Sequence, residues 1–139
     1  MRRRDFISGI AGSAATWPLD VQAQQSSRIR RVAVVMAFAE NDPQGQLRAT
    51  AFRQGLERAG WTPGRNIEVD YLWGLLDADG TRAVTTKLQR LAPEVIAVNS
   101  STSLRAIQSV APSVPIVFIA VSEPVGQGFV ASLARPGGN

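Results

Sequence analysis

A run of polar residues follows a short apolar segment in the middle of the chain, and its side chains are of the types that bind small anions. The segment Val95–Val98 is continuous, apolar and β-prone, which predicts a strand buried on both faces. Five polar residues follow it directly: Asn99, Ser100, Ser101, Thr102 and Ser103. Leu104 and Ile107 lie three positions apart, which predicts a helix that starts within the hydroxyl run. A helix amino terminus offers N–H donors and partial positive charge, so this stretch suits a carboxylate or another anion.

Two more loops are expected at the same edge of a sheet, because ligands in open α/β sheets bind at the carboxyl ends of the strands. Residues 37–45 follow the first predicted strand and carry Phe38, Glu40 and Asp42, while Ser122 and Glu123 follow the last. The ligand-binding residues predicted on this basis are Phe38, Glu40, Asn99, Ser100, Ser101, Thr102, Ser122 and Glu123.

Each of these residues also has a purely structural interpretation. The hydroxyl cluster can serve only as a helix cap, and Glu123, which precedes a proline, can be a solvated turn residue. Phe38 can pack against the first helix instead of facing a cleft. Trp61 and Trp73 fit partial core or surface better than ligand contacts.

The composition excludes several classes of chemistry. The chain has no histidine and no cysteine, so histidine-based acid–base catalysis, Cys/His zinc sites and thiol catalysis are ruled out, and we predict no catalytic residue, metal site or cofactor. From residue 24 onward, 12 basic and 9 acidic residues give a net charge of only +3. This charge is too weak and too dispersed to predict a nucleic-acid partner.

The first 23 residues have the features of an export signal. Three arginines precede a moderately apolar stretch at residues 6–19, and small residues stand before the predicted cleavage after Ala23. Arg3 and Arg4 with Phe6 and Ile7 fit the twin-arginine pattern. The apolar stretch is shorter than the roughly 20 residues that span a bilayer, so no stable membrane insertion is expected after signal removal. Residues 24–30 are then predicted to be a flexible lead-in.

The rest of the chain alternates between strand and helix patterns. Strands are predicted at residues 31–36, 66–73, 95–98 and 116–121, with the alternating second strand at the sheet edge. Helices are predicted at 46–59, at 79–91 with Asp79 or Thr81 as cap, at 102–109, and in the first turns at 129–134. This succession predicts an α/β fold with a doubly wound parallel sheet in the order 2-1-3-4.

Four blocks of the sequence resemble the periplasmic substrate-binding proteins of ABC transporters, in the group that includes tryptophan and tyrosine receptors. They are the leader ending in VQAQQ, AFRQGLERAGWTPGRNIEVDY at 51–71, LAPEVIAVNSS at 91–101, and PIVFIAVSEPVGQGFVASLARPGGN at 115–139. The resemblance implies a type I fold of two lobes that close on a ligand, of which residues 31–139 would form part of the first lobe. It further implies a periplasmic receptor that is not an enzyme and that passes a small-molecule solute to an ABC permease in the inner membrane.

The predicted site fits an amino acid or a related carboxylate as that solute. Hydroxyls and N–H groups at residues 100–102 would hold a carboxylate, and Glu40 or Glu123 would hold an ammonium group. Phe38 or Trp73 would stack on an apolar side chain. Closure of a second lobe would then exclude water.

Other interpretations stay open at this point. One is a truncated product without transport function, whose exposed sheet edge would make it poorly soluble. Another is an exported α/β hydrolase, although the chain has neither a Gly-x-Ser-x-Gly elbow nor a histidine base. A nucleotide-binding or phospho-acceptor domain is disfavoured, because no glycine-rich phosphate motif follows a strand.

Overall fold

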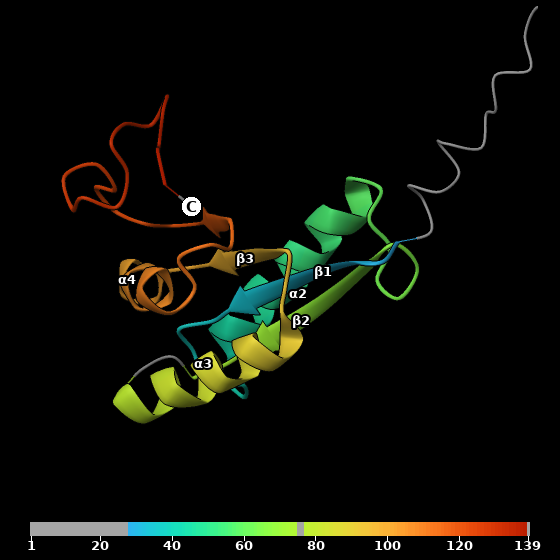
Figure 1. Ribbon diagram of the computed structural model, residues 1–139. Helices are drawn as coiled ribbons and strands as arrows, with labels where there is room; N and C mark the ends of the chain where they lie inside the picture. The colour runs from blue at the N-terminus through green and yellow to red at the C-terminus, as the bar shows by residue number, and fades with distance from the viewer. Residues whose placement is uncertain (1–27, 75–76, 139) are drawn as a thin grey trace, which may run out of the picture.

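The computed structural model describes residues 28–74 and 77–138. The predicted export signal at 1–23 and residues 24–27 of the predicted lead-in lie outside the described residues. Strands and helices alternate along the described chain (Figure 1): β1 (Arg30–Val35), α2 (Pro43–Arg58), β2 (Ile67–Leu72), α3 (Ala78–Leu91), β3 (Val95–Val98), α4 (Ser101–Val110) and β4 (Ile116–Phe118). None of the described helices is long and apolar enough to cross a bilayer.

The four strands form one parallel sheet in the order β2-β1-β3-β4, which confirms the predicted order. Val34 of β1 lies opposite Tyr71 of β2 on one side and opposite Ala97 of β3 on the other. The alternating strand β2 occupies one edge of the sheet, as predicted, and the short strand β4 occupies the other.

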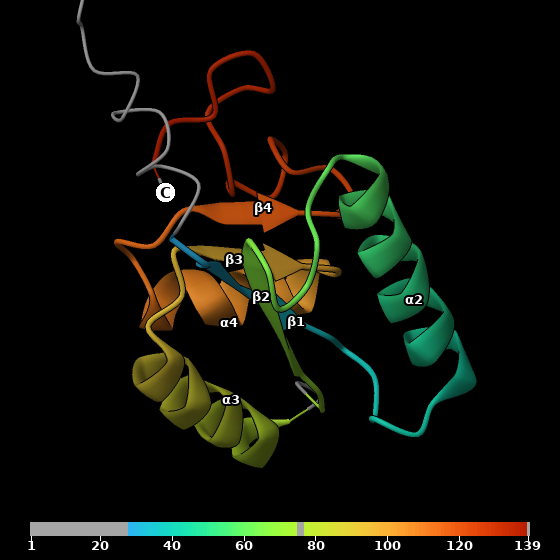
Figure 2. The ribbon, with the colours of Figure 1, turned by 90° about the vertical axis from the view of Figure 1, so that its right-hand side faces the viewer.

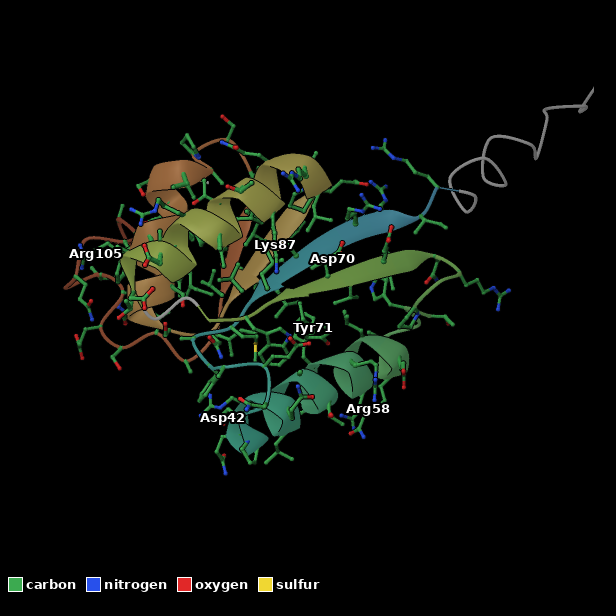
Figure 3. The ribbon with its side chains drawn as sticks, turned by 90° about the horizontal axis from the view of Figure 1, so that it is seen from below. Asp42, Arg58, Asp70, Tyr71, Lys87 and Arg105 are labelled. Carbon is green, nitrogen blue, oxygen red and sulfur yellow. The ribbon has the colours of Figure 1, made fainter. Side chains whose placement is uncertain are left out.

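Helices cover the sheet unequally on its two faces. The helices α3 and α4 lie on one face, where their Val84, Leu88, Leu104 and Ile107 pack in one cluster with Ile96. Among the described helices, only α2 lies on the other face (Figure 2), where Ala49 and Phe52 meet a smaller cluster that includes Val34 and Ala97. The strand alternation sends neighbouring side chains to opposite faces, so Tyr71 points toward α2 while Asp70 does not (Figure 3). The Tyr71 hydroxyl donates to the Ala49 carbonyl of α2 at 3.0 Å, and its burial raises the pKa of that hydroxyl.

Side-chain caps fix the start of each helix. Asp42 accepts from the Gln44 and Gly45 N–H groups at 2.8 and 3.0 Å, ahead of Pro43 at the first helical position of α2. Asp77 caps α3 by accepting from the Gly80 N–H at 2.7 Å, so the prediction of Asp79 or Thr81 as cap is wrong.

Two predictions near the carboxyl end are also wrong. Strand β4 ends at Phe118 instead of residue 121, because Ala120 adopts a left-handed φ of 54° that no strand continues through. Residues 129–134 form no helix start. A single turn precedes them and ends at Gly128 with φ of 74°, and the Ala131 N–H donates to the Pro136 carbonyl at 2.8 Å. Phe129 is instead buried against the α4 face of the core.

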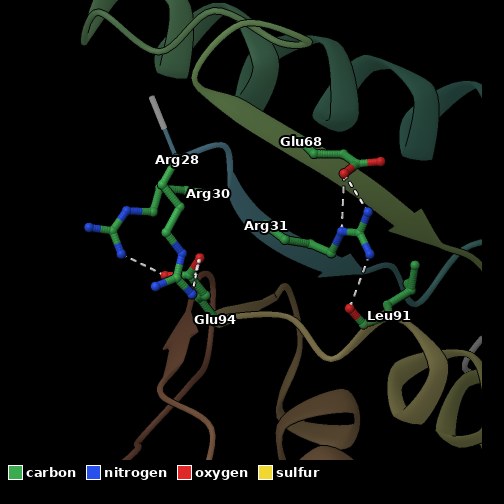
Figure 4. Close-up of polar contacts among 6 residues, drawn as sticks. All are labelled: Arg28, Arg30, Arg31, Glu68, Leu91 and Glu94. Carbon is green, nitrogen blue, oxygen red and sulfur yellow. Dashed lines mark hydrogen bonds and ion pairs between the residues drawn. The ribbon is translucent and has the colours of Figure 1, made fainter. Parts of the chain in front are cut away.

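Charged residues tie the amino ends of the strands together (Figure 4). Arg30 donates to Glu94 at 2.6 Å, and Arg28 lies 3.5 Å from the same carboxylate. Arg31 donates to Glu68 at 2.5 Å and to the Leu91 carbonyl at 3.3 Å. These contacts fasten β1 to β2 and to the loop that leads into β3, at the end of the sheet opposite the predicted ligand edge.

The Glu94 ion pair makes stability depend on pH. The hydrogen bond from Arg30 is the main cause that lowers the pKa of Glu94 below its ordinary value of 4.5. A lowered folded-state pKa means that the stabilisation is complete above about pH 4.5 and is lost as the pH falls below it. We expect Glu94→Gln to flatten the dependence of Tm on pH between about pH 3 and 5. Equal slopes for Glu94→Gln and the parent chain would contradict this assignment.

Candidate functional site

Backbone and side-chain hydrogen bonds join the loops at the carboxyl edge of the sheet. The Ala37 N–H, just after β1, donates to Asn99 Oδ1 at 3.1 Å, a contact between residues 62 positions apart. The Ile119 N–H, just after β4, donates to the Val98 carbonyl at 2.8 Å. The structure therefore brings the ends of β1, β3 and β4 together, as the sequence predicted.

Asn99 acts first as a connector. Its Oδ1 holds the loop after β1, and its Nδ2 is buried without a hydrogen-bond partner. An unpaired buried amide nitrogen is costly, so it marks a position where a further acceptor would be stabilising.

The four hydroxyl residues at 100–103 differ in role: one caps α4, one is buried, and two border the surface. Ser100 caps α4, because its Oγ accepts from the Ser103 N–H at 3.0 Å and donates to Ser103 Oγ at 2.9 Å. The cap interpretation therefore holds for Ser100, and Ser103 is fully buried. Ser101 is half-buried and Thr102 is exposed, and both border an open hollow of about 560 Å³ with Arg105 and Gln127.

Of the two predicted ligand-binding residues in the loop after β1, one packs against the core and the other is exposed. Phe38 belongs to the smaller core cluster, and a Cβ on Gly45 would come within 2.8 Å of the Phe38 Cβ. The Arg48 guanidinium lies 5.4 Å from the centre of the Phe38 ring. This arrangement supports the packing interpretation of Phe38. Glu40 is exposed, and its backbone carbonyl accepts from Gln46 Nε2 at 2.5 Å.

Ser122 and Glu123 lie in an exposed turn beyond β4. Glu123 has a left-handed φ of 45°, and its carbonyl accepts from the Gln127 N–H at 2.8 Å. The Gln127 side chain donates to the Ser122 carbonyl at 2.7 Å. The backbone of both residues therefore builds the turn, and the Glu123 carboxylate stands at an exposed position.

Sequence reasoning missed two arginines at this edge. Arg48 stacks on Phe38, and Arg105 lies 4.8 Å from the centre of the Phe129 ring. Arg48 also borders a largely apolar cavity of about 250 Å³ between α2 and the sheet, to which Met36, Asn99 and Ile119 contribute. Arg48 lies four positions before Phe52, which faces the sheet, so the two side chains share one face of α2. This spacing is the signal that would have revealed Arg48. In the described ranges, no three acidic side chains are grouped so that they could hold a metal ion.

We expect two substitutions of Asn99 to distinguish the role of its Oδ1 atom from that of its Nδ2 atom. Asn99→Ala leaves the Ala37 N–H without an acceptor and lowers the free energy of unfolding by about 1–3 kcal/mol. Asn99→Asp keeps an oxygen at the position of Oδ1, so the bond to Ala37 survives. Amide hydrogen exchange at Ala37 measures this directly: rapid exchange is expected in Asn99→Ala and slow exchange in Asn99→Asp. Equal exchange in both variants would show that Asn99 does not hold this loop.

Comparisons with known proteins converge on one class of protein. A family model described as "ABC transporter substrate binding protein" matches residues 31–139. A tyrosine-binding protein of Clostridioides difficile is 33% identical over 88 residues, which cover 63% of this chain and 26% of that protein.

Solved structures agree with that match. The ligand-free, open structure of a substrate-binding protein with adhesive properties from Clostridium difficile has a TM-score of 0.67 and 27% identity, and covers 79% of this chain. A conserved domain protein from Vibrio cholerae has a TM-score of 0.69 and 28% identity, and covers 81%. An ABC domain from Streptococcus pneumoniae in complex with L-Trp has a TM-score of 0.69 but only 19% identity, so it supports the fold alone. The chain spans 37% of the length of each of these solved chains.

Proposed function

The chain belongs to the family of ABC transporter substrate-binding proteins, and on this premise we propose that it forms part of the first lobe of a periplasmic receptor. This receptor captures an amino acid or a related carboxylate and delivers it to an ABC permease in the inner membrane. Two of the proteins that the chain matches are a tyrosine-binding protein and a substrate-binding protein, which supports a binding role.

The observation that carries the proposal is the junction of three loops at one sheet edge, made by the Ala37–Asn99 and Ile119–Val98 hydrogen bonds. The junction lies beside the amino terminus of α4, where N–H groups favour a carboxylate. In this proposal Ser101 and Thr102 contribute hydroxyls to the carboxylate, and Asn99 Nδ2 gains the acceptor that it lacks. Ser100 contributes through its cap, which fixes the helix start.

An exposed carboxylate of the protein would bind the ammonium group of the ligand. Glu40 and Glu123 both stand on loops that follow strands at this edge, and both are exposed. The Ser122 carbonyl accepts from the Gln127 side chain and so holds the turn that carries Glu123. Phe38 packs against the smaller core cluster and so supports the loop after β1. The tyrosine-binding relative supports an amino acid as the ligand class.

Isothermal titration with the 20 common L-amino acids tests the proposal on the complete two-lobe receptor. We expect binding of at least one amino acid, weakened roughly 10-fold or more by Glu123→Gln, since a charge-assisted hydrogen bond contributes about 1.5–3 kcal/mol. Thr102→Val removes one hydroxyl and should weaken binding by a factor of about 2–10. Thr86→Val, on the exposed face of α3, is the matched control and should leave affinity unchanged. Absence of heat with every amino acid would overturn the ligand class.

A further inference from the structure

An aspartate–glycine pair, Asp79–Gly80, occurs once in the sequence and lies in the first turn of α3. The Asp79 side chain is 83% exposed, and its carboxylate pairs with Arg82 one turn later. Glycine has no Cβ, so the side chain of a preceding aspartate can approach its amide nitrogen with little hindrance. The pair therefore carries the two groups of an intramolecular condensation, a carboxyl carbon and an accessible amide nitrogen.

The cap of α3 keeps these two groups from reacting. The Gly80 N–H donates to Asp77 Oδ1 at 2.7 Å. Thr81 donates to the main-chain carbonyl of Asp77 from its N–H at 2.9 Å and from its hydroxyl at 2.8 Å. On another side, a Cβ on Gly80 would overlap the Gly74 carbonyl oxygen, so the turn has little room to move. Because helical N–H groups point along the axis toward the helix start, the Gly80 nitrogen cannot attack the Asp79 side chain while this turn is closed.

We propose that Asp79 is a site of spontaneous main-chain isomerisation, and that the Asp77 cap controls its rate. When the first turn of α3 opens, the Gly80 nitrogen bonds to Asp79 Cγ and closes a succinimide ring. The hydroxyl of the protonated carboxyl group leaves with the amide proton as one water molecule. Water then adds to the main-chain carbonyl carbon of Asp79 and breaks its bond to the Gly80 nitrogen. The main chain afterwards runs through Cγ, and the former main-chain carbonyl becomes the free carboxylate.

The isomerised product loses a contact that reaches the candidate site. Isomerisation adds one carbon to the main chain between Asp79 and Gly80, so the Gly80 N–H no longer lies where Asp77 accepts it. Gly80 lies against Gly74, whose N–H donates to the Phe38 carbonyl in the loop after β1 at 2.8 Å. Chemical ageing of α3 therefore loosens the support of that loop. The inference does not depend on whether the receptor takes an amino acid, so it and the proposed function fail separately.

Incubation in heavy-oxygen water measures the reaction, because each passage through the ring adds one heavy oxygen atom whichever bond reopens. The full-length protein is incubated in its native state and, in parallel, unfolded in urea. Trypsin then releases residues 66–82 as one peptide, in which Asp70 and Asp77 are internal controls because neither precedes a glycine. Fragmentation in the mass spectrometer assigns the heavy oxygen to one residue. We expect it at Asp79 in both samples, with the native protein reacting at least about 10-fold more slowly, since its first turn must open locally.

Two substitutions of Asp77 test the control by the cap. Asp77→Ala removes the acceptor and should speed the native reaction roughly 2- to 30-fold, whereas Asp77→Ser keeps a capping oxygen and should preserve most of the protection. In urea the parent chain and both variants should react equally, because the cap exists only in the folded chain. Absence of heavy oxygen at Asp79 in urea would overturn the modification site. Equal rates in the native and unfolded protein, or equal native rates in the parent chain and Asp77→Ala, would overturn the control by the cap.

Discussion

We expect Ile96→Ala to lower the free energy of unfolding by about 2–5 kcal/mol, because it opens a cavity in the packed centre of the sheet. Ile96 is fully buried on β3 and packs with Leu104 and Ile107 of α4. β3 also carries the residues that lead into the candidate site. The same substitution should therefore loosen the junction at the Asn99 loop as well as the core.

Ile119→Ala is the matched control for Ile96→Ala. It removes the same atoms from a side chain that is 45% exposed, so the cost should stay below about 1 kcal/mol. Urea unfolding followed by circular dichroism measures both variants under one condition. Similar costs for the two substitutions would contradict the unequal covering of the two sheet faces.

The strands of this fold were predictable because the pattern of apolar side chains in each strand matches the sheet faces that are buried. The run at 95–98 has no polar residue, as a strand between two layers requires, and it forms β3 with the predicted bounds. The alternation at 67–72 placed β2 at the edge, and the strand–helix succession gave the order 2-1-3-4 through the rule of right-handed crossovers.

The candidate site was predictable only in its location. Sequence periodicity indicates that residues 99–103 follow a strand, but it does not indicate which hydroxyl caps the helix and which stays exposed. The bond between Asn99 and Ala37 joins segments 62 residues apart, and no local pattern encodes such a pair. Phe38 was ambiguous for the same reason, since its packing depends on Gly45 and Trp73 from two other segments.

The carboxyl-terminal predictions failed where backbone conformation overrides side-chain pattern. The apolar residues at 129–134 are spaced like a short helix, but left-handed Gly128 and the turn closed at Pro136 direct the chain elsewhere. The apolar run at 116–121 predicted burial on both faces, whereas the described structure covers one.

Gly80→Ala carries the second large effect, and its sign is opposite to that expected from helix propensity. Alanine is favoured over glycine within a helix by about 1 kcal/mol. At Gly80, in the first turn of α3, an added Cβ would instead overlap the backbone carbonyl oxygen of Gly74. Gly74 cannot easily move away, because its N–H donates to the Phe38 carbonyl at 2.8 Å and its φ is 81°. We therefore expect a net loss of about 1–3 kcal/mol in the free energy of unfolding, as for other overpacked sites.

Gly55→Ala provides the contrast that separates the two causes. Gly55 lies within α2, and an added Cβ would have no atom within 4 Å, so only propensity acts there. This substitution should raise the free energy of unfolding by about 0.5–1 kcal/mol. Urea midpoints of the two variants should therefore move in opposite directions from the parent chain. A rise in both midpoints would show that the Gly74 carbonyl yields without cost. In that case the contact between α3 and Gly74, in the loop after β2, would not constrain the candidate site.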